Sequence, residues 1–553
     1  MSRKLLIVLM AFMLAVIPLA GCASTTSGTN ASDTPKTITI AEGSNFVGGF
    51  AAIYGPEQGN SMSYYRYISN FYETLVNYDN GKITPGLAES WKLSDDGLVY
   101  TFDLRKGVKF SDGTDFTAEV VKLNLENTNK ILGKAAVNYG LLNSLIEKVV
   151  VVNDNVLEIH LTRPYYAALS NLAMVMPRGI MAAAAFNEDG TLSKTLGTTT
   201  LGTGPYMYAG DNKNDLEYTF VRNPVYYGEK PQVDGFTVKV IPDNEAKTLA
   251  LRNGEVDLIA GSDNISYSSY AQLDAEEQYT GKVSGTHLLT EFLAMNPTVA
   301  PFDDIKVRQA VNHAINKQSI AKDLFGGLKT AADTIMDTSL PYCDISVTPY
   351  TYDAEKAKSL LQEAGWADSN GDGVREKNGA PLAAELKYVS TPTNDKAMLA
   401  IQQNLADIGM KVTLNGIELM AFYSDIFSAG KYVMTYYESY GILYDPFTFV
   451  SNMNPNMDYT KASYSTDPMV SKALSNLSYD EAYNLTSGLL SLVGEDKIRQ
   501  SFHYALEKAH ENGVLVPVTY RNELALFNNK TISGYAFQGQ PVQINVAGVT
   551  LGK

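Results

Sequence analysis

Apolar and polar residues alternate with a period of two in several short segments of this chain. The alternation is clear over residues 37–41, 98–104 and 156–161. Side chains of a strand point to opposite faces in turn, so this pattern predicts strands with one buried face. Residues of the types that favour turns flank these segments, among them Asp79-Asn80-Gly81, which predicts a hairpin.

Helical spacing of apolar residues appears in the segments between the strands. It predicts helices over residues 67–78, over residues 305–325 for about five turns, and over residues 353–366. The last of these begins with an Asp cap and ends in Ala-Gly. Residues 401–417 predict a helix, a glycine stop and then a strand. Because strands and helices recur in turn, we expect an α/β protein with helices packed on open sheets.

The first residues have the pattern of a secretory signal peptide. Arg3 and Lys4 precede an apolar run, and Leu-Ala-Gly leads to Cys22. This end resembles a bacterial lipobox, whose cysteine is lipidated and becomes the new N-terminus. We therefore expect residues 1–21 to be removed. Residues 22–36 would be a lipidated cysteine and a flexible tether, since they lack hydrophobic periodicity.

Two other interpretations of the N-terminus carry less weight. An ordinary signal peptide could end in cysteine by chance, and the run could be a membrane-spanning anchor. The apolar run contains Pro18 and is about 16 residues long, short of the ~20 that span a bilayer. We expect the mature chain outside the cytoplasmic membrane, held by lipid on Cys22.

Length and charge narrow the class of protein. The 553 residues exceed what one compact core usually holds, so two or more lobes are expected. The net charge of −16 becomes −18 when the two positive charges of Arg3 and Lys4 are lost. Such a surface repels nucleic acid and anionic lipid headgroups. Cys22 and Cys343 are the two cysteines, and lipidation of the first leaves no intramolecular disulfide.

The sequence offers no catalytic constellation. Its five histidines include no HExxH and no Cys-x-x-Cys partner, and no nucleophile–base pattern supports a lipoprotein hydrolase. Residues 368–379 resemble an EF-hand loop, with Asp368, Asn370 and Asp372 at the first, third and fifth positions. Gly379 stands where a bidentate Glu is needed, so strong calcium binding is not expected, and a weaker calcium role stays open.

Specific sequence blocks carry a family resemblance. Residues 72–121 resemble the signature of the family 5 extracytoplasmic solute-binding proteins, the peptide- and nickel-type receptors of ABC importers. The resemblance continues in the same order through residues 202–206, 222–231, 251–259, 295–317, 352–366 and 444–450.

This resemblance implies a two-lobed periplasmic-binding-protein-like α/β fold, of class II and the large type, with a hinge between the lobes. Lobe I would take residues 37–279, with an extra subdomain at about 86–200, and lobe II residues 280–513. Residues 514–553 would return to lobe I. The implied protein is a monomeric receptor without catalysis or cofactor, and its partners are ABC permease and ATPase subunits.

The ligand is the open question. Peptide-binding members place an Asp a few residues before an Asp-Pro step, where it pairs with the peptide's amine. Here Ile442 or Leu443 fills that place, and an enclosed ammonium without a carboxylate would be poorly compensated.

Other blocks resemble the nickel-binding branch, whose members take metal as a complex with a small organic chelator. They are residues 331–344, 374–386 and 440–453. By that resemblance Tyr440, Tyr444 and Asp445 lie at the ligand from lobe II. Tyr139, Arg178, Tyr65 and Arg66 would lie there from lobe I.

Within this predicted set, Arg178 is the first candidate to pair with the chelator's carboxylates and Arg66 is the second. Tyr139 and Tyr440 could stack on a planar chelate. Plain packing for the tyrosines and a surface salt bridge for Arg178 are the alternatives.

The match to the nickel branch is incomplete. No histidine lies between Asp445 and Asp458, where the nickel receptor uses one, and no arginine accompanies Tyr139. Direct metal ligation by the protein is therefore not expected. A metal chelate is favoured over a short peptide. A surface sensor that passes its closed form to a signalling receptor is the alternative from another class.

Overall fold

The computed structural model describes residues 35–46, 49–53, 62–79, 82–133, 139–212, 216–287, 289–439, 447–455, 467–489, 492–540 and 542–552. Cys22 and the predicted site residues Tyr440, Tyr444 and Asp445 lie outside these described residues. Within the described part, no helix has the length and apolar character needed to cross a membrane.

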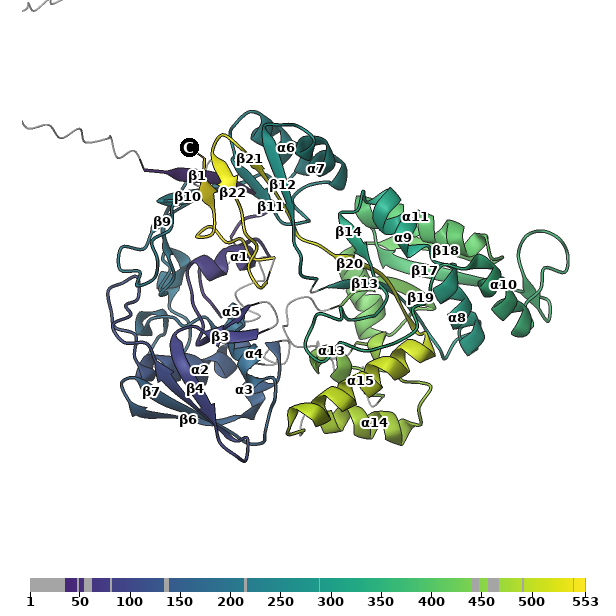
Figure 1. Ribbon diagram of the computed structural model, residues 1–553, viewed down its shortest axis with the longest axis horizontal. Coiled ribbons are helices and arrows are strands. Elements are labelled where there is room, and N and C mark those ends of the chain that lie inside the picture. Colours follow the sequence, from purple (N-terminus) through teal and green to yellow (C-terminus); the bar gives the residue numbers. More distant parts are fainter. Residues whose placement is uncertain are drawn as a thin grey trace, which may run out of the picture. The chain divides into compact units, whose positions relative to one another are not determined.

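A seven-stranded sheet forms the first half of the molecule. Its strand order is β12-β21-β11-β1-β10-β9-β8. In that order the strands span Tyr279–Val283, Leu524–Asn528, Leu258–Ala260, Thr37–Glu42, Gly235–Val240, Glu217–Arg222 and Tyr206–Asn212. The N-terminal β1 runs parallel to β10 and β11, and the late β21 is inserted between β11 and β12. Figure 1 shows β21, from late in the chain, close to β11 and β12 in this sheet.

A six-stranded sheet forms the second half. Its order is β14-β20-β13-β19-β17-β18. The strands span Lys329–Ala331, Leu515–Arg521, Thr290–Met295, Met434–Glu438, Ala383–Val389 and Lys411–Ile417. Its own buried cluster includes Leu293, Val307, Leu386, Ile401 and Val516.

The chain passes between the two sheets twice. The first crossing joins β12 to β13 through residues 284–289, and the second joins β20 to β21 through residues 522–523. We call the described residues 36–283 and 524–552 lobe I and residues 290–521 lobe II. The expectation of a two-lobed α/β fold is confirmed.

Lobe I carries a second, four-stranded antiparallel sheet with order β4-β5-β7-β6. These strands span Ala88–Leu93, Val99–Leu104, Val156–Leu161 and Ile146–Asn153. The hairpin of β2 (Val76–Asp79) and β3 (Lys82–Pro85) precedes this sheet, and Asp79 pairs with Lys82 as the Asp79-Asn80-Gly81 turn signal requires. The helices of lobe I are α1 Met62–Tyr67, η1 Ile68–Asn70, α2 Ala118–Leu132, α3 Leu142–Leu145, α4 Ala168–Leu172, α5 Val175–Arg178, η3 Ala183–Ala185, η4 Lys194–Gly197, α6 Asn244–Arg252 and α7 Tyr267–Asp274.

The start of one helix of lobe II and the end of another lie where the sequence signals predict. In α10 (Ala354–Glu363), the Asp353 side chain accepts a hydrogen bond from the Lys356 backbone N–H. After α11 (Pro392–Ala406), Gly409 has φ +85° and turns the chain into β18. The other helices are α8 Ile305–Ala314, α9 Lys317–Ser319, η5 Ile320–Leu324, α12 Leu419–Tyr423, η6 Ser424–Ser428, α13 Phe447–Ser451, η8 Val470–Lys472, α14 Tyr479–Gly488 and α15 Glu495–Asn512. Short pairs complete the strands: β15 Glu376–Lys377 with β16 Ala380–Pro381, and β22 Ile532–Gly534 with β23 Thr550–Leu551.

Two predicted helices are wrong in extent. Residues 67–78 do not form one helix: helical structure ends at Asn70, and β2 begins at Val76. The Leu75 carbonyl accepts hydrogen bonds from the Gly86 and Ala88 backbone N–H groups, so pairing with a distant segment replaces the helix. The helix predicted over residues 305–325 breaks at Ile315, whose backbone is extended, and resumes as α9 and η5.

The carboxyl group of Glu73 contacts residues of lobe I that are distant in the sequence. Its two oxygens accept hydrogen bonds from the Thr203 hydroxyl at 2.8 Å and from the Tyr227 hydroxyl at 2.9 Å. Burial raises the pKa of Glu73 from 4.5 to about 7, although these two hydrogen bonds and the charge of Arg105 lower it in part.

This shift predicts a loss of stability as pH rises. Between about pH 4.5 and pH 7 the folded protein holds a proton on Glu73 that the unfolded chain has released. The free energy of unfolding therefore falls across this window, by up to about 3 kcal/mol. Glu73→Gln, which stays neutral, should remove that part of the pH dependence in urea unfolding measured at several pH values. Glu89→Gln, at a largely exposed carboxylate, is the control, and equal pH profiles for both variants would contradict the assignment.

Candidate functional site

Arg178 ends the short helix α5 in lobe I. The Arg178 backbone N–H donates to the Met174 carbonyl at 3.1 Å, and Gly179 N–H donates to the Val175 carbonyl at 2.7 Å. A Cβ atom at Gly179 would lie 2.8 Å from the Tyr72 Cβ atom, so only glycine lets this turn pack against Tyr72. The turn fixes where the Arg178 side chain enters the core.

The Arg178 guanidinium is buried, and the described part of the chain offers it no hydrogen-bond partner. The residue is 3% exposed, and none of its three guanidinium nitrogens has a hydrogen-bond partner among the described residues. Burial lowers the pKa of Arg178 to about 10, and the nearby Tyr165 phenol opposes this shift only in part. An isolated buried cation is costly, so the arrangement favours a site that an anion fills.

Tyr139 lies in the same neighbourhood as Arg178. The Tyr139 hydroxyl donates to the Met176 sulfur at 3.7 Å, and Met176 is two residues before Arg178. The backbone N–H of Leu141 donates to the Tyr165 hydroxyl at 3.4 Å, which ties the Tyr139 segment to the residue beside Arg178. The structure thus brings these two predicted site residues together.

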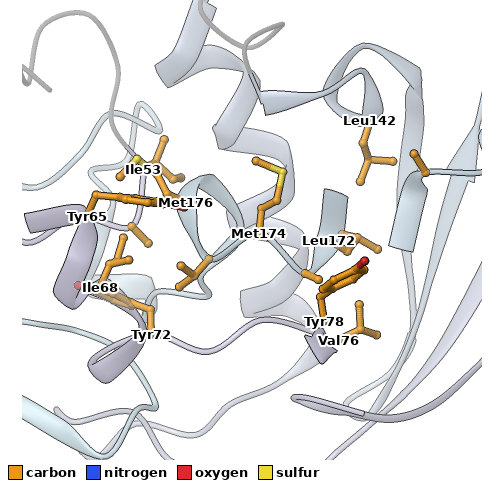
Figure 2. Packing of buried hydrophobic residues seen from close by; sticks show 14 of the residues in the cluster. Ile53, Tyr65, Ile68, Tyr72, Val76, Tyr78, Leu142, Leu172, Met174 and Met176 are labelled. Atoms are coloured by element: carbon orange, nitrogen blue, oxygen red, sulfur yellow. The ribbon is translucent and has the colours of Figure 1, made fainter. Parts of the chain in front are cut away.

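Tyr65, in helix α1, lies near Tyr139. It is 4% exposed, and its hydroxyl donates to the Gln540 side-chain carbonyl at 2.5 Å. Burial is the main cause that raises the pKa of Tyr65, and the Tyr139 phenol raises it further. Figure 2 shows Tyr65, Met174 and Met176 among the packed side chains of this cluster.

Arg66, the second candidate for a ligand carboxylate, already has two partners. One of its terminal nitrogens lies 2.9 Å from Glu42 and the other 3.0 Å from Asp263. Its side chain is 5% exposed. Because protein carboxylates occupy Arg66, Arg178 is the better candidate of the two arginines.

The Arg178 neighbourhood also reaches lobe II. The Tyr165 ring lies 5.8 Å from the ring of Phe447, which begins α13 directly after the segment that holds Tyr440, Tyr444 and Asp445. Those three residues lie outside the described residues, so their part in the site stays a prediction.

Sequence reasoning missed Tyr165, Met176 and Gln540. Each contacts the residues around the candidate site through a partner 24 to 475 positions away in the chain.

The five histidines all have acceptors within the protein. His160 pairs with Glu158, His287 with Asp337, His313 with the Thr351 carbonyl, His503 with Asp344, and His510 with the Thr348 carbonyl, all at 2.6 to 2.9 Å. These contacts fix one ring nitrogen of each imidazole to a neighbouring carboxylate or carbonyl.

The EF-hand-like loop draws Asp368, Asp372 and Glu376 together, with carboxylate oxygens within 4.8 Å of one another. The same oxygens accept backbone hydrogen bonds within the loop. Gly371 and Gly373 donate to Asp368 at 2.7 and 3.1 Å, and Ser369 donates to Glu376 at 3.0 Å. These contacts shape the turn that leads to β15, and calcium binding stays untested.

The chain matches the model of the family described as "Bacterial extracellular solute-binding proteins, family 5 Middle" over residues 82–460. It belongs to this family. Family 5 proteins are transport receptors and not enzymes, and they work with ABC permease and ATPase subunits.

The individual relatives are named for two kinds of ligand, metal and peptide. The chain is 32% identical over 459 residues to the nickel-binding periplasmic protein of Escherichia coli (strain K12), covering 82% of this chain and 84% of that protein. It is 31% identical over 391 residues to the glutathione-binding protein GsiB of Salmonella choleraesuis (strain SC-B67), covering 69% and 70%. The structure of NikA from Brucella suis in complex with Fe(III)-EDTA aligns with a TM-score of 0.82 at 30% identity, covering 93% of this chain and 99% of that one.

The unpaired state of Arg178 predicts a stability gain on its removal. Arg178→Met keeps the apolar stem and removes the uncompensated charge. In the ligand-free protein this variant should raise the free energy of unfolding by about 1–3 kcal/mol, measured by urea unfolding.

A matched control is Arg252→Met in α6. The Arg252 guanidinium is paired with Glu276 at 2.6 Å near the surface, so its loss should lower stability by about 1 kcal/mol or less. An Arg178→Met variant that is less stable than the wild type would show that the guanidinium has a stabilising partner.

Proposed function

We propose that this family 5 receptor captures a small metal chelate that carries carboxylate groups and delivers it to its ABC permease. Nickel or another metal would arrive bound to an organic chelator that carries carboxylates. The observation that carries this proposal is the buried Arg178 guanidinium, which has no hydrogen-bond partner among the described residues.

Arg178 suits a carboxylate because its planar fork can donate two parallel hydrogen bonds to it. Bringing a carboxylate to the guanidinium would turn an uncompensated buried charge into a charge-assisted pair. The Tyr139 and Tyr65 rings nearby offer apolar faces and hydroxyls that can orient a compact ligand.

The chelator would supply the metal's ligands in this proposal. Among the described residues, no histidine belongs to a cluster of three or more potential metal ligands, so the proposal assigns the metal's ligands to the chelator. Two relatives support a metal complex. One is named as nickel-binding, and the other was crystallised with Fe(III)-EDTA, a polycarboxylate chelate.

A short peptide is the second candidate. The relative GsiB is named for glutathione, a small peptide with free carboxylates, and Arg178 could pair with such a group as well. The sequence lacks the Asp expected near Ile442 to hold a peptide amine, which favours the chelate.

We also propose that the receptor is a lipid-anchored monomer outside the cytoplasmic membrane. The lipobox-like sequence that ends at Cys22 supports this placement. Detergent-phase partitioning tests it, because Cys22→Ser should move from the detergent phase to the aqueous phase.

Ligand identity can be tested by thermal shift of the purified protein. We expect stabilisation by Ni(II) with excess L-histidine or by Fe(III)-EDTA, of about 2.7 kcal/mol at 100 times the dissociation constant. Ni(II) alone should give a much smaller shift, since the proposed site recognises the chelator. Arg178→Met should weaken chelate binding at least about tenfold, because it removes a charge-assisted pair.

The control variant for binding is again Arg252→Met, which should bind like the wild type. A clear shift with glutathione or di- to pentapeptides and none with a metal chelate would overturn the chelate proposal. Unchanged chelate affinity in Arg178→Met would contradict the assigned role of Arg178.

A further inference from the structure

Arg521 occupies the point where the chain crosses from lobe II to lobe I. It is the last residue of β20 and directly precedes the crossing residues 522–523. Its backbone N–H donates to the Leu289 carbonyl at the end of the other crossing, at 2.9 Å. Arg521 therefore lies where the two connections between the lobes run next to each other.

The Arg521 guanidinium contacts carboxylates of both lobes. One terminal nitrogen lies 3.0 Å from Asp263, in the loop between β11 and α7 of lobe I. The other lies 3.2 Å from Glu438, the last residue of β19 in lobe II. A third nitrogen donates to the Ser262 hydroxyl at 2.9 Å. The charge of Arg521 is the largest cause that lowers the pKa of Asp263.

Both carboxylates connect onward toward the candidate site. The second oxygen of Asp263 pairs with Arg66, the neighbour of Tyr65, at 3.0 Å. Gly261 makes this approach possible, since a Cβ atom there would lie 3.1 Å from the Arg66 side chain. Glu438 leads along the chain into the segment of the predicted site residues Tyr440 and Tyr444.

Other charges near this chain of contacts are already matched. Glu291 lies opposite Glu438 in the register of β13 and β19, and it forms an ion pair with Lys329 at 2.6 Å. Glu42 forms an ion pair with Arg66. Glu523 accepts from the Ser262 backbone N–H at 2.8 Å and is also an ion-pair partner of Arg521, 3.6 Å from its Nε. Arg521 is thus the cation that joins the carboxylates of the two lobes.

We propose that the Asp263–Arg521–Glu438 bridge is a conformational latch at the hinge. It stabilises the lobe arrangement that brings the two walls of the site together, and its loss favours the open form. Arg521, Asp263 and Glu438 are positioning residues in this role, because they act through the lobes and not by touching ligand.

Solvent access makes the bridge sensitive to salt. The Asp263 and Glu438 side chains are 55% and 40% exposed. Screening shortens the range of such interactions from ~10 Å at 0.1 M salt to ~3 Å at 1 M. High salt should therefore open the wild-type protein in the same way as removal of the carboxylate charges.

Small-angle X-ray scattering of the ligand-free protein tests this latch. The double variant Asp263→Asn with Glu438→Gln should have a larger radius of gyration than the wild type at ~0.1 M NaCl. Raising NaCl to ~1 M should increase the wild-type radius and leave that of the variant unchanged. Glu276→Gln, which breaks the remote pair with Arg252, should behave like the wild type. Equal radii for the wild type and the double variant at low salt would overturn the proposal.

A second variant and a second readout make the result decisive. Arg521→Met removes the bridging cation and should give the same enlarged radius, with circular dichroism to confirm that it is folded.

In the double variant, chelate binding should weaken by about two- to thirtyfold through faster dissociation, as expected for two partly exposed pairs. This binding readout rests on the proposed function, whereas the ligand-free scattering does not. Scattering therefore decides on the latch even if no metal chelate binds.

Discussion

A cation buried without a counter-charge is the physical constraint on which this account of the site depends. Arg178 is held in the core of lobe I by α5, yet its guanidinium finds no acceptor among the described residues. The folded state bears that desolvation cost as long as the site is empty. A ligand carboxylate would relieve it, so the protein's instability at this point becomes binding energy for an anion.

The surrounding fold separates the roles of neighbouring charges. Arg66 and Arg178 are both arginines of lobe I with little exposure, but Arg66 is neutralised by Glu42 and Asp263 and belongs to the frame. The frame continues through Asp263 to Arg521 and into lobe II. In our proposals the paired charges hold the geometry of the hinge, and Arg178 is the charge that receives the ligand. Ligand contacts would favour the closed form over the open form, so a permease could distinguish ligand-bound from empty receptor by its shape.

Local signals in the sequence predicted much of the fold. Strands at 37–41 and 156–161, the Asp cap of α10 and the glycine after α11 appear as expected, because each depends on residues within one turn or strand. The helix predicted over residues 67–78 failed because Leu75 pairs with Gly86 and Ala88, a tertiary contact that helical spacing cannot reveal. The same limit applies to the site. The family resemblance ranked Arg178 before Arg66, but the sequence could not show that protein carboxylates occupy Arg66, since one of them, Asp263, lies 197 positions away.

The central claim is that Arg178 receives a carboxylate of the bound chelate. A crystal structure of the protein grown with Ni(II) and L-histidine tests it most directly. The account predicts a chelator carboxylate oxygen within about 2.7–2.9 Å of an Arg178 terminal nitrogen. A bound chelate seated elsewhere, with the Arg178 guanidinium still unpaired or paired to a carboxylate of the protein, would contradict it.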